Sequence, residues 1–111
     1  MSDQNLNWSD SVRYILSNAS DIPESGGLYK VLRDDGKEGK LTRVYVGKAA
    51  NLRSQFNYHL SDSEENECLR KNLKNKTCYF KYALLSGEEN RQNAEADLLS
   101  EGTYECNIQG Q

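Results

Sequence analysis

The sequence predicts an α+β fold, a small three-stranded antiparallel sheet flanked by helices. Residues 28–33 and 41–47 are two runs rich in β-forming residues, and the turn-forming stretch 34–40 joins them, as is typical of a hairpin. A third run, 77–85, alternates in the way that predicts another strand. One face of that strand consists of Cys78, Phe80, Tyr82 and Leu84. Helical patterns around these runs predict the helices that pack against the sheet.

The central helix is predicted to begin after residue 51. Leu52, Phe56, His59 and Leu60 recur at helical spacing, and Asn51 is suited to the N-cap. A polar loop, 61–67, then leads to a short basic segment, 68–76, which is also predicted to be helical.

The clearest helix covers residues 86–102, where Ser86 and Glu89 are spaced as a capping box and Gly102 is placed to end the helix. We expect the residues after it to pack back on the sheet or fray. At the other end of the chain, apolar residues at helical spacing follow a cap at Ser9 or Asp10; they are Val12, Ile15 and Leu16. Residues 1–21 are therefore interpreted as an N-terminal helical extension and residues 22–111 as the main domain.

The composition limits the class of protein. A chain of 111 residues is one domain, and 36% hydrophobic with 28% charged residues is typical of a globular protein rather than a disordered one. The longest apolar runs fall far short of the roughly 20 residues that cross a membrane. The N-terminus is acidic and polar, unlike a signal peptide, so the cytoplasm is the expected compartment.

Three cysteines, Cys68, Cys78 and Cys106, form no CxxC pair. Together with His59 they would allow a zinc site, but their spacing favours free thiols in a reducing compartment.

The net charge of −3 is unevenly distributed. Residues 29–82 hold twelve Lys and Arg against seven Asp and Glu, a balance of +5, while the segments before and after carry −3 and −5. A basic middle fits an anionic ligand, although it fits a solvated surface nearly as well.

Two tripeptides carry a family resemblance. Gly27-Leu28-Tyr29 opens the first strand, and Tyr45-Val46-Gly47 ends the second. The chain thus resembles the GIY-YIG nucleases, with Leu and Val in place of the two isoleucines. The run YVGKA-x-NL, His59, Glu95 in AEADLL and Asn107 in ECNI match further family elements in order, so that the resemblance covers about residues 22–110. It implies the GIY-YIG-like fold and metal-dependent hydrolysis of DNA phosphodiester bonds.

The resemblance also implies the catalytic roles. Tyr29 would be the general base, and Tyr45 would position the water or the phosphate. Lys48 would lower a phenol pKa or hold a phosphate, and His59 would assist proton transfer or contact the phosphate. Glu95 would bind one divalent cation, Mg²⁺ or Mn²⁺, since a single carboxylate with waters and phosphate oxygens suits Mg²⁺.

Gln55 departs from the family pattern, because it stands where the family has its catalytic arginine, four residues before the histidine. Glutamine keeps a hydrogen-bonding reach but loses the charged fork of arginine. The substitution is interpreted as engineered, as compensated by Arg53, or as a drift towards binding without cutting. We expect a nuclease site with weakened or lost activity.

Three functions compete. The first is the endonuclease, and the second is a non-cutting nucleic-acid binding module on the same fold. A protein-interaction domain is the third, because a fold does not fix a function. Family members usually join this domain to a separate DNA-targeting domain. The residues expected to contact DNA are Lys48, Arg53, Arg70, Lys71, Lys74, Lys76 and Asn107.

Overall fold

The computed structural model describes residues 6–36, 40–61 and 63–107 and has an α+β architecture. Its sheet has four strands in the order β1-β4-β2-β3, all antiparallel to their neighbours. The elements follow in the order β1 (Val12–Arg13), η1 (Leu16–Asp21, a 3₁₀ helix), β2 (Gly27–Asp34), β3 (Leu41–Ala49), α1 (Leu52–Leu60), α2 (Glu67–Asn75), β4 (Cys78–Leu84) and α3 (Glu88–Glu101).

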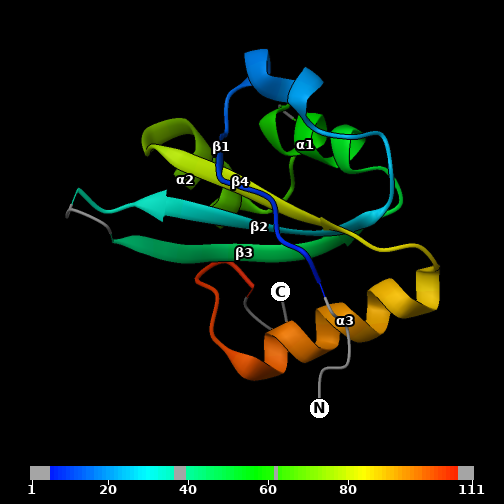
Figure 1. The fold of residues 1–111 in the computed structure, drawn as a ribbon. Coiled ribbons are helices and arrows are strands. Elements are labelled where there is room, and N and C mark those ends of the chain that lie inside the picture. Colours follow the sequence, from blue (N-terminus) through cyan, green and yellow to red (C-terminus); the bar gives the residue numbers. More distant parts are fainter. Residues whose placement is uncertain (1–5, 37–39, 62, 108–111) are drawn as a thin grey trace.

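The helices form two layers with the sheet between them. Figure 1 shows α1 and α2 on one face and α3 on the other. The larger core lies on the α1 side, where aromatic and aliphatic side chains from every strand meet. No helix in the described part of the chain is long and apolar enough to span a bilayer.

The first segment differs from the predicted helix. Val12 and Arg13 pair with Phe80 and Tyr79 of β4, which adds the fourth strand, and only a 3₁₀ helix follows. The reason is the burial of Tyr14. Its ring stacks on the Phe56 ring, with the two centroids 4.3 Å apart, and its hydroxyl donates a hydrogen bond to the Phe56 carbonyl. An extended backbone delivers this ring to the core, and a local helical preference is too weak to compete with that contact.

The hairpin of β2 and β3 and the helix after Asn51 are confirmed. The Asn51 side chain accepts a hydrogen bond from the Ser54 amide at 3.0 Å, as an N-cap does. Because Val31 pairs with Tyr45 and Tyr29 pairs with Gly47, both tyrosines project from the same face of the sheet, towards α1. The β2–β3 pairing shifts its register between Val31 and Leu32, so the part that holds the two tyrosines is regular.

One predicted detail of the last strand is confirmed, and one of the last helix is wrong. Leu84 lies on the same face of β4 as Phe80 and Cys78, but it is exposed because β4 ends there. The N-cap of α3 is Gly87, with φ of 92°, and no side chain caps this helix. Gly87 occupies the cap position in the left-handed region that glycine tolerates, which displaces the predicted Ser86–Glu89 capping box. Gly102 does end α3 as predicted.

The C-terminal segment packs beside β3 as predicted, within residues 104–107. The amides of Glu105 and Cys106 donate to the carbonyls of Arg43 and Val44, which pairs part of the outer edge of the sheet. The remaining residues, 108–111, lie outside the described residues.

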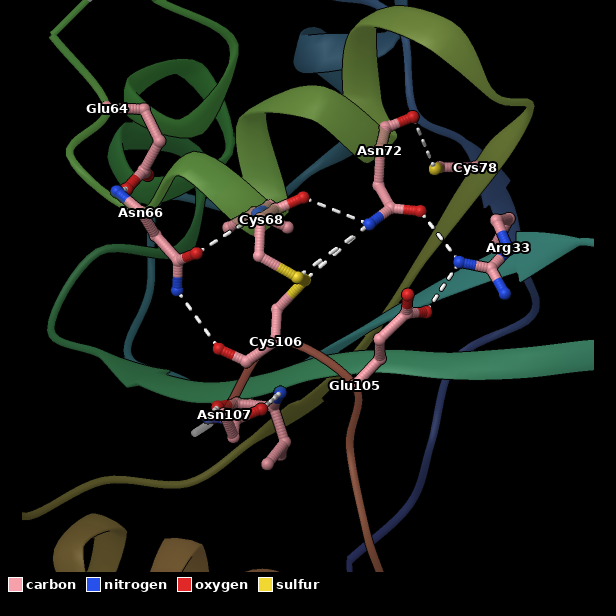
Figure 2. Close-up of a disulfide and its surroundings, with 11 residues drawn as sticks. Arg33, Glu64, Asn66, Cys68, Asn72, Cys78, Glu105, Cys106 and Asn107 are labelled. Carbon is pink, nitrogen blue, oxygen red and sulfur yellow. Dashed lines mark hydrogen bonds and ion pairs between the residues drawn. A yellow bond between two sulfur atoms is a disulfide. The ribbon is translucent and has the colours of Figure 1, made fainter. Parts of the chain in front are cut away.

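A disulfide between Cys68 and Cys106 ties this segment to α2, so the prediction of free thiols is wrong for this pair. The two Cα atoms lie 5.5 Å apart, although 38 positions separate them in the sequence. Asn66 bridges the same two parts by donating to the Cys106 carbonyl (Figure 2). Cys78 alone is a free, buried thiol. A zinc site is not supported, because the described residues contain no cluster of three metal-ligating side chains.

Candidate active site

The two tyrosines of the paired tripeptides lie side by side at the β3 edge of the sheet. Their ring centroids are 6.1 Å apart. Tyr29 is only 1% exposed, whereas Tyr45 is half-buried and is the member of the pair that reaches the surface. Since only an accessible hydroxyl can touch a substrate, their burial divides the two phenols into an inner and an outer group.

Gly47 makes room for the inner phenol. A Cβ built at this position would lie 2.5 Å from the Tyr29 hydroxyl oxygen and 2.6 Å from the ring carbon that bears it, closer than packed atoms approach. The glycine of the second tripeptide is therefore a steric requirement of the tyrosine of the first.

We expect Gly47→Ala to move the Tyr29 ring and to lower the free energy of unfolding by about 1–3 kcal/mol, the usual cost of overpacking. Urea unfolding measures the loss, and the NMR spectrum of His59, the one histidine of the chain, reports the displaced phenol. Gly36→Asn is a matched control, because nothing lies within 4 Å of a Cβ at Gly36 and asparagine tolerates its φ of 81°. Equal stabilities and spectra for Gly47→Ala and the control would contradict the steric role.

Helix α1 supplies the polar groups around Tyr29. His59 Nε2 lies 2.7 Å from the Tyr29 hydroxyl, and the imidazole is buried at 4% exposure. Gln55, one helical turn earlier, reaches the same phenol, where its hydrogen bond acts to lower the pKa of Tyr29. Residues i and i+4 share one face of a helix, so the capped start of α1 positions both side chains together.

Glu64 completes the group, and sequence reasoning missed it. It follows α1 in the loop before α2 and is 7% exposed, and its carboxylate is hydrogen-bonded to His59 Nδ1. The segment SDSEENE consists of polar residues that are ordinarily exposed, so nothing in its pattern distinguishes this glutamate from its neighbours. Its position five residues after the histidine was the only available indication.

Burial dominates the electrostatics of the site. Desolvation, followed by the neighbouring Tyr45, raises the pKa of Tyr29 well above its ordinary value. The pKa of Tyr45 is raised by desolvation and by the charges of Glu95 and Glu64. Desolvation lowers the pKa of His59 although Glu64 acts to raise it, so His59 is neutral near pH 7.

Glu95 reaches the site from α3, in the other layer. Desolvation raises the pKa of its carboxyl, and the positive charge of Lys48 acts in the opposite direction. Among the described residues its carboxylate makes no hydrogen bond or ion pair, which leaves its oxygens free for a ligand. Lys48 is itself paired with Glu88, with its Nζ 3.0 Å from a carboxylate oxygen. A single uncommitted carboxylate fits a cation that retains most of its water, as Mg²⁺ does.

Two of the other predicted contact residues, Arg53 and Asn107, bind backbone groups, and Asn107 does so at the residue next to Tyr45. Arg53 donates to the Ile22 carbonyl at 2.8 Å, and Asn107 forms hydrogen bonds to both backbone groups of Val46. Both side chains therefore hold backbone in place. Within the described residues, no hydrogen bond or ion pair links the basic side chains of α2 and the residue after it to the tyrosines; these are Arg70, Lys71, Lys74 and Lys76.

Comparison with known proteins identifies the fold. A scan against models of protein families finds no match. The UvrABC system protein C of Rickettsia akari is 30% identical over 94 residues, which cover 85% of this chain and 13% of that protein. The corresponding protein of Rickettsia canadensis is 31% identical over the same length, covering 14% of that protein. The chain thus spans about one seventh of the length of these relatives.

Solved structures agree with this match. The magnesium-bound GIY-YIG N-terminal endonuclease domain of UvrC from Thermotoga maritima superposes with a TM-score of 0.62 at 18% identity, covering 83% of this chain and 93% of that domain. A tyrosine-to-phenylalanine mutant of that domain, bound to its catalytic divalent cation, gives a TM-score of 0.63. The sequence-derived resemblance is therefore confirmed at the level of the fold, which is that of the GIY-YIG endonuclease domain in these solved structures.

Proposed function

We propose that this chain is a metal-dependent DNA endonuclease domain of the GIY-YIG type whose activity is weakened by Gln55. The observation that carries the proposal is the chain of hydrogen-bonding groups at the β3 edge: a half-buried Tyr45, a buried Tyr29 and His59 with Nε2 2.7 Å from the Tyr29 hydroxyl. A buried phenol that faces a neutral imidazole has a proton acceptor within reach, which is what a tyrosine base requires.

The burial of Tyr29 assigns different tasks to the two phenols. Tyr45, at the surface, meets the attacking water and accepts its proton as it passes its own proton to Tyr29. Tyr29 remains the internal base and hands a proton on to His59. The water oxygen bonds to phosphorus, the bond from phosphorus to the 3′ oxygen breaks, and the leaving oxygen takes a proton from solvent. The products are 5′-phosphate and 3′-hydroxyl ends.

Glu95 is the proposed ligand of one divalent cation, Mg²⁺ or Mn²⁺. Such an ion, when bound, supplies charge neutralisation at the leaving oxygen. Lys48, now paired with Glu88, would exchange this partner for a DNA phosphate at little cost, because exposed ion pairs contribute about 0–1 kcal/mol.

Gln55 is the reason for which we expect a weakened endonuclease activity. Its side chain lies beside Tyr29, where an arginine would present a charged fork to the phosphate. Arg53 is a poor substitute, because its guanidinium is already held by the Ile22 carbonyl.

We also propose that DNA is the substrate. Its backbone would be contacted by basic residues of α2 and by the residue that follows this helix, namely Arg70, Lys71, Lys74 and Lys76. Because the relatives are about seven times longer, a separate targeting domain or partner protein would select the DNA. We further propose the cytoplasm as the compartment, residues 22–111 as the catalytic unit and residues 1–21 as an extension.

The competing proposal is a binding module that does not cut. It is favoured by the missing positive charge at Gln55. The two functions differ in their dependence on metal and salt, since binding through phosphate contacts weakens steeply with salt and needs no cation.

The test compares nicking of supercoiled plasmid in Mg²⁺ and in EDTA with gel-shift binding across salt concentrations, for this chain and for Gln55→Arg. A nuclease nicks only with Mg²⁺, at least when the arginine is present. Salt-sensitive binding with no cutting of plasmid or branched DNA by either protein would support the binding module instead.

A further inference from the structure

We propose that Glu64 is a positioning residue, which holds His59 in the tautomer that leaves Nε2 free to take a proton from Tyr29. The catalytic meaning of this assignment rests on the proposed nuclease function. The assignment of the His59 tautomer does not depend on that function, and it can be tested separately.

The hydrogen bonds determine which nitrogen carries the proton. A carboxylate only accepts hydrogen bonds, so the contact between Glu64 and His59 Nδ1 requires a hydrogen on Nδ1. A neutral imidazole has only one such hydrogen, which leaves a lone pair on Nε2. The Tyr29 hydroxyl, 2.7 Å from Nε2, is then the donor of the second hydrogen bond. Without Glu64, either tautomer would be free to form.

The carboxylate is itself held in position. Its second oxygen accepts a hydrogen bond from the backbone amide of Asn66 at 2.6 Å, and Figure 2 shows the Glu64 side chain extending towards Asn66. The Asn66 side chain caps α2 by accepting from the Leu69 amide, and it also donates to the Cys106 carbonyl. The loop that carries Glu64 is therefore fixed to α2 and to the C-terminal segment. Each of the two side-chain oxygens of this buried glutamate therefore has a hydrogen-bond partner.

The negative charge of Glu64 becomes important when the proton arrives. During the reaction the Tyr29 Oη–H bond breaks and a His59 Nε2–H bond forms, which converts the imidazole to an imidazolium. A buried cation costs several kcal/mol unless it is paired, and Glu64 is the anion in contact with it. After the products leave, the imidazolium returns its proton to solvent and the neutral tautomer is restored.

Among the described residues, Glu64 is the carboxylate in contact with His59. The titratable groups that face His59 and Tyr29 come from four parts of the fold: Tyr14 next to β1, Tyr45 on β3, Tyr58 on α1 and Glu64 in the loop after it. Burial raises the pKa values of Tyr14 and Tyr45, so among the described residues Glu64 is the contacting group that stabilises a protonated His59.

The tautomer is measured by ¹⁵N NMR, because His59 is the single histidine of the chain and its ring signals need no assignment. In the unchanged chain we expect a protonated Nδ1 and an unprotonated Nε2 at pH 7–8. Glu64→Gln keeps an acceptor for Nδ1–H and is expected to keep this tautomer. Glu64→Leu removes the acceptor and is expected to yield a mixture or the opposite tautomer. Because Glu64 acts to raise the pKa of His59, both substitutions should move the titration to lower pH.

The kinetic test uses the Gln55→Arg background, in which cutting is expected. Glu64→Gln is predicted to lower kcat by about 10²- to 10⁴-fold with little change in KM, because the buried imidazolium loses its paired charge. The acidic limb of the pH–rate profile should shift to lower pH together with the NMR titration. Glu65→Gln, at the exposed neighbouring position, is the matched control and should change neither measurement.

The two proposals fail in different ways. If Gln55→Arg cuts DNA and Glu64→Gln cuts equally well with the same pH profile, the positioning role is overturned and the nuclease proposal stands. If no variant cuts, the nuclease proposal fails, and the NMR spectra still decide the role of Glu64. An unchanged tautomer in folded Glu64→Leu overturns it, and a changed tautomer supports it. Circular dichroism shows whether Glu64→Leu folds. If it does not, the His59 titration of Glu64→Gln is the test, and an unchanged titration overturns the role of Glu64.

Discussion

Gln55→Arg is expected to raise Mg²⁺-dependent nicking of supercoiled plasmid by about 10²- to 10³-fold, the usual value of one electrostatic contact made in the transition state. The side chain at this position already lies beside Tyr29, so an arginine there brings a charged fork to the place where the phosphate is proposed to sit. The same positive charge would also favour the phenolate form of Tyr29. The rate is measured from the conversion of supercoiled to nicked DNA under single-turnover conditions.

Two further variants separate this effect from simple attraction to DNA. Asn57→Arg adds the same charge at an exposed position of α1 and should leave the cutting rate unchanged. Glu95→Ala, introduced together with Gln55→Arg, should return cutting to the background, because the proposed cation loses its protein ligand. If Asn57→Arg raises the rate as much as Gln55→Arg does, the effect is non-specific and the assignment of position 55 is wrong.

Reduction of the Cys68–Cys106 disulfide is expected to lower the free energy of unfolding by about 4 kcal/mol, from the loop-entropy relation applied to a separation of 38 residues. For a domain of this size the loss corresponds to a fall in melting temperature of roughly 15–30 °C. The effect is large because the bond joins α2 to the segment that pairs with β3. Thermal unfolding with and without dithiothreitol measures it.

A double Cys68→Ser, Cys106→Ser variant should match the reduced protein and respond no further to reductant. Cys78→Ala serves as the control, because it lacks the free buried thiol and should keep the full response to dithiothreitol. Equal melting temperatures of the unchanged chain with and without reductant would contradict the prediction. In a reducing cytoplasm the disulfide would be reduced, so the melting temperature with dithiothreitol also gives the stability of the domain in its proposed compartment.

Local patterns in the sequence were sufficient for most of the sheet and for the centre of the site. The alternation of β2 and β3 with the turn between them predicts the hairpin, and Asn51 predicts the start of α1. Because neighbouring strands and i, i+4 positions on a helix have fixed geometry, these elements bring Tyr29, Tyr45, Gln55 and His59 within reach of one another. The predicted residues are therefore brought together where their proximity depends on short-range geometry.

The predictions that failed depend on contacts between distant residues. Val12 and Arg13 form a strand because Tyr14 is buried against α1 and β4, and Cys68 meets Cys106 because the C-terminal segment returns to the sheet. Glu64 stands in a polar loop, and its burial against His59 follows from how α2 and the C-terminal segment close over that loop. By itself the sequence determined the strands, the main helices and the paired tyrosines, since each follows from neighbouring residues. Only the tertiary structure decided the fourth strand, the disulfide and the buried glutamate, because burial and long-range pairing depend on the whole packed chain.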